Sequence, residues 1–339
     1  MTSVVRPHAT NLVRWARDRS NVVVLSGDLT GSVEIGEFKR AYPDRFFSLG
    51  MAEQNMLSWA GGLAREGFVP FVHTFAVFLY RRPYDQLAMS VAYPNLRVRL
   101  FGFLPGLTTP GGVTHQAIED VALMRALPNM TVLEMGDATD VESVLDVTEQ
   151  VDGPVYIRML RGEVPRLFPE DEPIRLGACR QLTDGDDVTV ISSGICTEHA
   201  LRAVAVLRER GAGVRHLHIS TLKPFDDPLV LESLRAARHG VVTMENHTII
   251  GGLGSAVAEQ MAEHAVGTRL VRLGIQDTFA HGASLSYLLE KHALTSMDVV
   301  RSVEALMGTT FDISRDELAQ VEIGSTRSTS VGDEQLEAL

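Results

Sequence analysis

Short runs of β-branched residues alternate with stretches of helical periodicity along most of this chain. This alternation constrains the fold most strongly, because a strand, a crossover helix and a second parallel strand form the repeating unit of α/β proteins. In the first half, the expected strands are Asn21–Leu25, Arg45–Leu49, Val69–His73, Val98–Phe103, Thr131–Met135 and Val155–Met159. In the second half, they are Val188–Ser192, Val214–Ile219, Gly240–Met244 and Arg269–Arg272. We therefore predict an α/β protein with two doubly wound domains.

Changes in composition set the expected boundaries. We expect a first domain over residues 1–165 and a second over residues 178–312. The segment between them, 166–177, contains prolines and has no clean period, which is typical of a linker. Within residues 313–339, the stretch Asp316–Leu339 holds six acidic residues and one arginine and is rich in serine, threonine and glycine. This composition predicts a mobile tail.

Charge and cysteine usage exclude several classes of protein. The 31 lysines and arginines face 43 acidic residues, and this balance is unfavourable for binding nucleic acid. Cys179 and Cys196 lack metal-ligand spacing and cannot form a disulfide framework, which favours a reducing cytoplasm. The segment Met1–Thr10 has no apolar core of a secretion signal, and no apolar run approaches the length of a membrane span. We expect a cytoplasmic protein that binds neither nucleic acid nor membrane.

One acidic residue, Glu53, lies where an expected strand gives way to a helix, within the stretch Gly50–Ala64. Small and apolar residues surround it in the sequence. A carboxyl group in the first turn of a buried helix is partly desolvated, and such a group can share a proton with a ring nitrogen. The alternative is an acid that serves only the helix dipole.

Aromatic residues cluster after the next expected strand, in the stretch Thr74–Gln86. Phe75, Phe78 and Tyr80 lie within six residues of one another. An aromatic ring in this place can stack on a planar heterocycle, although core packing is the simpler interpretation. The two arginines that follow would ordinarily lie in a solvated turn.

A glycine-containing stretch, Pro105–Asp120, follows a third expected strand and includes His115. Glycine allows the backbone to approach a ligand closely. We expect His115 to lie at the start of the next helix, where an imidazole could act as acid, base or hydrogen-bond donor. A surface or capping histidine is the alternative.

Together, and in this order, these three stretches resemble the transketolase family. The likeness covers residues 5 to about 310 and is carried by the ordered set of motifs rather than by any one of them. Further matching segments are Ser26–Ser32, Leu127–Met130, Thr221–Asp226 and Gly251–Gly254. The resemblance implies a pyrimidine-binding domain followed by a transketolase C-terminal domain.

The resemblance also implies thiamine diphosphate as cofactor. Glu53 would hydrogen-bond ring nitrogen N1′ of the aminopyrimidine and promote its proton-accepting tautomer. Phe78, with Phe75 nearby, would stack on the pyrimidine. Asp28 and Arg81 would also lie at the cofactor.

A second set of residues is implied to bind a sugar-phosphate substrate. His115 would contact substrate hydroxyls or the developing oxyanion, and it is implied to be catalytic together with Glu53. Arg6, Ser32 and Arg158 fall where the family binds the phosphate, which suits recognition by guanidinium groups. His73 completes this set.

The family's Gly-Asp-Gly motif, which holds Mg²⁺ and the diphosphate, is absent from the sequence. The resemblance therefore implies that this chain supplies no metal ligand. It further implies a partner subunit that carries the diphosphate and magnesium site, in a heterotetramer of two plus two chains. The implied reaction is transfer of a two-carbon ketol unit from a ketose phosphate to an aldose.

Two positions depart from the family pattern. Gly111 stands where the family usually has an aspartate that reads a sugar hydroxyl, and Phe103 stands where it usually has a histidine near the substrate phosphate. Loss of polar recognition changes selectivity strongly. We therefore predict that the substrates are not, or not only, an ordinary pair of pentose phosphates.

Two other functions stay open at this stage. The β-subunit of a 2-oxoacid dehydrogenase E1 component, or a relative of deoxyxylulose-phosphate synthase, shares the fold and the glutamate. A non-catalytic assembly or regulatory subunit is the alternative of another class. A test of which donors are used distinguishes the 2-oxoacid dehydrogenase or synthase alternative from a transketolase. Replacement of Glu53 distinguishes the non-catalytic alternative from an enzyme.

Overall fold

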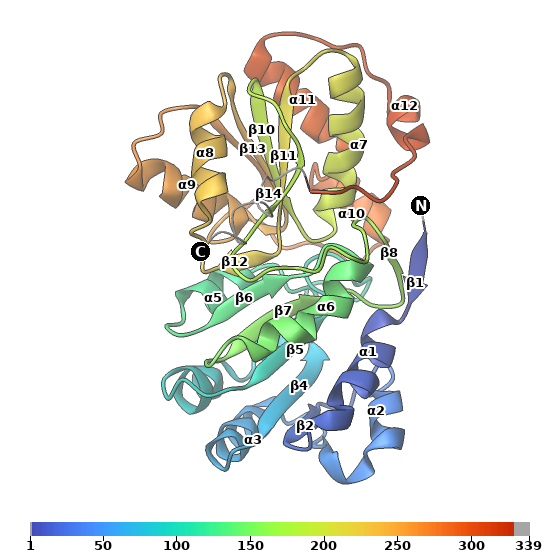
Figure 1. Cartoon of the computed structure of the whole chain (residues 1–339), viewed down its shortest axis with the longest axis vertical. Helices are drawn as coiled ribbons and strands as arrows, with labels where there is room; N and C mark the ends of the chain where they lie inside the picture. The colour runs from blue at the N-terminus through green and yellow to red at the C-terminus, as the bar shows by residue number, and fades with distance from the viewer. Residues whose placement is uncertain (1, 329–339) are drawn as a thin grey trace, which may run out of the picture.

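Two α/β domains are stacked along the long axis of the molecule (Figure 1). The computed structural model describes residues 2–328. The first sheet has seven strands, in the order β12 (Thr221–Lys223), β6 (Thr131–Glu134), β7 (Val155–Met159), β5 (Arg99–Phe103), β4 (Val69–Phe75), β2 (Val22–Ser26) and β3 (Phe46–Ser48). The second has five, in the order β14 (Leu270–Ile275), β13 (Gly240–Thr248), β10 (Val188–Ser193), β11 (Val214–Ile219) and β9 (Arg180–Thr183). The predicted α/β class with two domains is confirmed.

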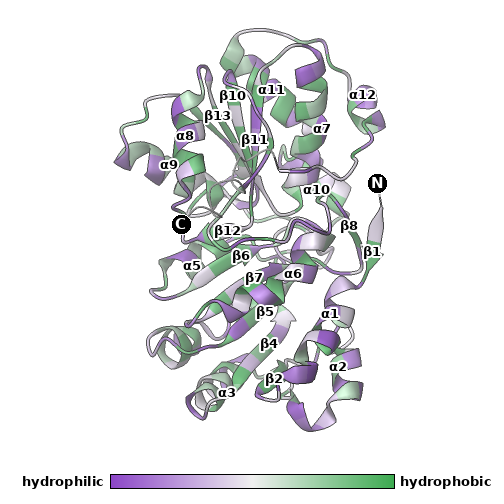
Figure 2. Ribbon diagram, viewed as in Figure 1, coloured by the Kyte–Doolittle hydropathy of each residue, from purple (hydrophilic) through white to green (hydrophobic). Residues whose placement is uncertain are grey.

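Both sheets are parallel except at one edge. β12 pairs antiparallel with β6, and β9 pairs antiparallel with β11. β2, β5 and β7 are buried at every position, as expected for parallel strands with helices on both faces. Figure 2 shows apolar residues along the strands and hydrophilic residues on the outer sides of the helices. A short antiparallel pair, β1 (Ser3–Val5) with β8 (Glu163–Pro165), lies apart from both sheets.

Helices cover both faces of each sheet. In the first domain, they are α1 (Pro7–Trp15), η1 (Ala16–Asp18), α2 (Gly36–Ala41), η2 (Pro43–Arg45), α3 (Glu53–Arg65), η3 (Ala76–Leu79), α4 (Tyr84–Gln86), η4 (Leu87–Ala92), α5 (Asp120–Ala126) and α6 (Ala138–Glu149). Residues of α3, η4 and α5 join one buried apolar cluster, and residues of α1, α2 and α6 join another. The core of the first domain is therefore divided by its sheet.

The second domain follows the same plan. Its helices are α7 (Cys196–Glu209), α8 (Pro228–Ala236), α9 (Leu253–Glu263), α10 (Leu285–Lys291), α11 (Ser296–Met307) and α12 (Arg315–Gln320). Figure 1 shows α7 and α11 on one face of the second sheet and α8 and α9 on the other. A capping box between Thr295 and Asp298 fixes the start of α11, and Gly308 in a left-handed conformation ends it.

Three expectations about the elements need correction. The tail expected from residue 313 begins with helix α12, whose Leu318 is buried against the second core. The last residues of that expected tail, 329–339, lie outside the described residues. Helix α5 begins at Asp120, so His115 lies in a loop and not at the start of that helix as expected. β12 belongs to the second half of the chain but completes the first sheet.

No helix within residues 2–328 is both long and apolar enough to cross a membrane.

Candidate functional site

Glu53 is the first residue of α3 and its side chain is 2% exposed. The chain reaches it from β3 through Gly50, which adopts a left-handed conformation that favours glycine. A carboxylate at a helix N-terminus is stabilised by the helix dipole. Its Oε1 accepts a hydrogen bond of 2.6 Å from Nη1 of Arg82.

Two phenylalanine rings and an imidazole lie together. Phe75 ends β4 and Phe78 lies in η3, with ring centroids 6.1 Å apart and planes inclined by 24°. The ring of His115 stands edge-on at 5.5 Å from Phe78 and 6.2 Å from Phe75. Nδ1 of His115 is 2.9 Å from the hydroxyl of Thr114, which fixes the orientation of the ring.

Arg82 connects the carboxylate to the aromatic pair. Its guanidinium lies 4.0 Å from the ring centroid of Phe78 while it donates to Glu53. The guanidinium of Arg82 is a planar group with nitrogen donors. Its contacts therefore indicate which kind of group can lie between Glu53 and Phe78. A planar, nitrogen-bearing ring can contact the Glu53 carboxylate and the face of Phe78 at once. These residues therefore fit an aminopyrimidine.

The sequence interpretation placed Arg81 at the cofactor, and the structure places it elsewhere. Its guanidinium pairs with the carboxylate of Glu119 at 2.6 Å and donates to the carbonyls of Val113 and Gln116. Arg81 therefore holds the loop that carries His115, and the neighbouring Arg82 contacts Glu53. Adjacent positions in a turn point in different directions, and the sequence gives no signal that separates the two arginines.

A second group of expected residues lines an open hollow. Arg6, Asp28 and Ser32 meet there, together with Arg161 and Glu34. Nη1 of Arg161 donates to the carbonyl of Ser32 at 2.7 Å, and Glu34 accepts from the backbone of Gly162, next to Arg161. The hollow thus combines two guanidinium groups, which can bind an anion, with the carboxylates of Asp28 and Glu34. Arg161 was missed in the sequence, although a basic residue two positions after strand β7 could have indicated it.

His73 lies in the core and not at the hollow. Its ring is fully buried, stacks on Phe101 with centroids 4.4 Å apart, and places Nε2 3.0 Å from Nε2 of His8. Burial holds the pKa of His73 well below its usual value and lowers that of His8 to about 3. The expectation of substrate contact by His73 is therefore replaced by a packing role.

Arg158 is also unavailable for a substrate. Its guanidinium is fully buried, pairs with Asp120 at 2.8 Å and also pairs with Glu134. It donates further to the carbonyls of Ala117 and Asn246, at 3.1 Å each. With its donors committed to protein groups, Arg158 belongs to the junction of the two domains, which corrects the expectation of phosphate binding.

The two positions that depart from the family pattern border these groups. A β-carbon added at Gly111 would lie 3.0 Å from Cβ and Cγ of His115. Phe103 is fully buried, with its ring 5.6 Å from that of His8. Among residues 2–328, no group of three or more histidine, cysteine or acidic side chains could hold a metal ion.

Comparison with known proteins follows the same division of the chain. Residues 8–166 match the family model described as the transketolase pyrimidine-binding domain. Residues 177–299 match the model described as the transketolase C-terminal domain.

The chain is similar over most of its length to three proteins in particular. A transketolase family protein of Sinorhizobium fredii is 40% identical over 299 residues, covering 88% of this chain and 86% of the relative. A 6-deoxy-6-sulfo-D-fructose transketolase subunit of Clostridium sp. is 40% identical over 293 residues, covering 86% and 90%. A solved structure described as a split-gene transketolase, an inactive β4 tetramer, aligns with a TM-score of 0.80 and 39% identity, covering 90% and 97%.

Proposed function

Since this chain belongs to the transketolase family, we propose that it is the subunit of a split transketolase that binds the pyrimidine half of thiamine diphosphate. The observation that carries this proposal is the buried carboxylate of Glu53, which Arg82 links to the aromatic pair of Phe78 and Phe75. Arg82 already joins these groups with a planar, nitrogen-bearing guanidinium. When bound, thiamine diphosphate supplies the carbon nucleophile for cleaving and forming the carbon–carbon bond.

The residues of this chain have distinct tasks in that reaction. Glu53 holds a proton at the pyrimidine nitrogen, and Phe78 orients the ring by stacking. His115, at the edge of the aromatic pair, contacts the substrate and stabilises charge on its oxygen. For the pyrimidine to take its place, Arg82 must leave the face of Phe78.

The hollow of Arg6, Ser32 and Arg161 is the proposed site for the anionic end of a sugar. Phosphate and sulfonate both offer oxygens to guanidinium groups. The similar Clostridium subunit is named for a sulfo sugar, and the change at Gly111 removes a polar side chain from the region of His115. We therefore propose a ketose with an anionic end group as donor, and an aldose as acceptor.

A partner subunit is proposed to bind the diphosphate and Mg²⁺. Large apolar side chains are exposed on or beside α3 and η4: Met51, Trp59, Met89 and Tyr93. Monomeric proteins seldom expose such groups close together, and α3 begins with Glu53. This surface is the proposed contact with the partner, in a heterotetramer of two plus two chains.

The test is to purify the chain with a partner that carries the Gly-Asp-Gly motif, and to measure thiamine diphosphate binding and ketol transfer. Xylulose 5-phosphate, a 6-sulfo ketose and pyruvate are compared as donors. Glu53→Gln should abolish transfer while the complex still assembles, whereas Glu66→Gln, at the exposed end of the same helix, should not. Unchanged turnover in Glu53→Gln, or decarboxylation of pyruvate without ketose cleavage, would contradict the proposal.

A further inference from the structure

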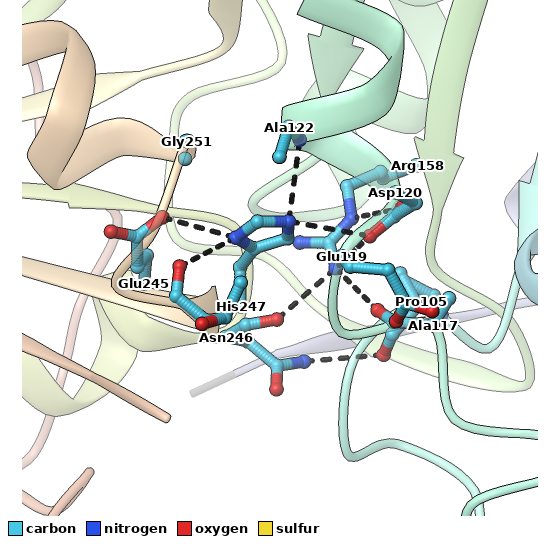
Figure 3. A network of polar contacts seen from close by, with 12 residues as sticks. Pro105, Ala117, Glu119, Asp120, Ala122, Arg158, Glu245, Asn246, His247 and Gly251 are labelled. Carbon is cyan, nitrogen blue, oxygen red and sulfur yellow. Dashed lines mark hydrogen bonds and ion pairs between the residues drawn. The ribbon is translucent and has the colours of Figure 1, made fainter. Parts of the chain in front are cut away.

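The loop that carries His115 connects β5 to α5 and lies against the second domain. Two backbone groups of this loop bond to one side chain at the end of β13, Asn246. Its Oδ1 accepts from the amide of Leu107 at 2.9 Å. Its Nδ2 donates to the carbonyl of Pro105 at 3.2 Å (Figure 3). The side-chain amide of Asn246 thus bonds to the backbone of the loop on both sides of Gly106.

The loop backbone packs closely against Asn246 at Gly106. A β-carbon added at Gly106 would come within 2.3 Å of both the side chain and the backbone of Asn246. The backbone carbonyl of Asn246 accepts from Arg158, which also donates to the carbonyl of Ala117 near the far end of the loop (Figure 3). One end of the loop therefore bonds directly to Asn246. The other end, at Ala117, is linked to Asn246 through Arg158 of the first domain and also accepts from the amide of Gly106.

Further contacts join the same two parts. The amide of Thr248 donates to the carbonyl of Ile118 at 2.8 Å. The buried side chain of Gln116, next to His115, donates to the carbonyl of His281 at 3.2 Å. Gln116 is thus a second tether from the second domain, independent of Asn246.

We propose that Asn246 is a positioning residue for substrate binding, through which the second domain sets the place of His115. This inference rests on the proposed function of His115 at the substrate. The second domain then has a task in the reaction although none of the groups proposed at the pyrimidine comes from it. Glu53, Phe75 and Phe78 all belong to the first domain, so loss of the tether changes substrate handling and not cofactor affinity.

The experiment uses the assembled complex with three variants of this chain. Asn246→Ala removes the first tether, and Gln116→Met removes the second with little change in size. Lys223→Met is the matched control, because Lys223 also follows the linker in sequence and donates to carbonyls of the first domain, those of Arg125 and Leu127, away from the loop.

Three quantities are measured for each complex. They are the hydrogen exchange rate of the amides of Gly106 and Leu107, the affinity for thiamine diphosphate, and kcat and KM for donor and acceptor. Asn246→Ala should speed exchange at both amides and lower kcat/KM about 10- to 100-fold, as expected for a misplaced substrate-binding group, with unchanged cofactor affinity. Gln116→Met should act in the same direction, and Lys223→Met should change only thermal stability.

The results that would refute the positioning role of Asn246 differ from the result that would refute the proposed function. If Asn246→Ala speeds exchange but leaves kcat/KM unchanged, or if Lys223→Met lowers kcat/KM equally, the positioning role is refuted. If Asn246→Ala fails to assemble, the Gln116→Met complex decides by the same criteria. A wild-type complex that transfers no ketol unit would refute the proposed function, while exchange at Leu107 would still decide whether Asn246 holds the loop.

Discussion

Replacement of Arg158 by methionine should destabilise the folded chain severely. The guanidinium is fully buried and faces two carboxylates, Asp120 and Glu134, whose side chains are 0% and 4% exposed. Removing one partner of a buried ion pair costs about 3–5 kcal/mol, because the remaining charge stays buried without compensation. Here two carboxylates are left, so we expect a loss of at least about 4 kcal/mol, which is roughly a thousandfold in the unfolding equilibrium.

The assay is urea-induced unfolding of the purified chain, followed by circular dichroism and tryptophan fluorescence. Arg158→Met combined with Asp120→Asn and Glu134→Gln should recover much of the loss, because neutral amides are far less costly to bury than carboxylates. Arg315→Met, which breaks an exposed pair with Glu290, should leave the midpoint unchanged. A loss below about 1 kcal/mol for Arg158→Met, or an equal loss in the triple variant, would refute the reasoning.

Three further predictions follow from the site and the core. Arg82→Gln should tighten thiamine diphosphate binding several-fold in the assembled complex, because the cofactor no longer has to displace Arg82 from its ion pair with Glu53. Unchanged or weaker binding in a fluorescence titration would count against this. Burial lowers the pKa of His8 to about 3, so below about pH 6.5 the unfolded chain binds a proton that the folded chain does not. The free energy of unfolding should therefore fall as the pH drops from 6.5 towards 3, by about 1.4 kcal/mol per unit for this group, and less steeply in His8→Gln. Gly111→Asp should lower kcat/KM for every donor, because its Cβ would lie 3.0 Å from His115, and improved use of xylulose 5-phosphate would contradict this.

The sequence predicted the secondary structure best where the hydrophobic pattern of a segment reflects its burial in the core. The central strands of both sheets were predictable because both faces are buried, so each strand reads as a nearly continuous apolar run. β12 was not predictable, since three residues carry no period and their pairing with β6 depends on how the domains meet. The start of α5 was predicted too early, because the apolar residues Ala117 and Ile118 are buried by contacts of the loop and not by a helix.

For the candidate site, the ordered motifs predicted residues whose positions along the chain agree with the structure. Glu53, Phe75 and Phe78 lie at or just after strand ends, where the sequence places them. His73 was misassigned because alternate residues of a strand face opposite sides, and this one faces α1 and His8. Arg158 was misassigned because its carboxylate partners, far away in sequence, become visible only in three dimensions.

Strand β12 makes the first sheet depend on a segment from the second half of the chain. It leaves the second domain at Thr221, supplies the edge of the first sheet beside β6, and returns to the second domain at α8. Recombination that joined this first half to a foreign second half at the linker would have to import a strand that matches β6, or leave that edge of the sheet unpaired. A designed chimera should therefore keep residues 221–223 with the sheet that they complete.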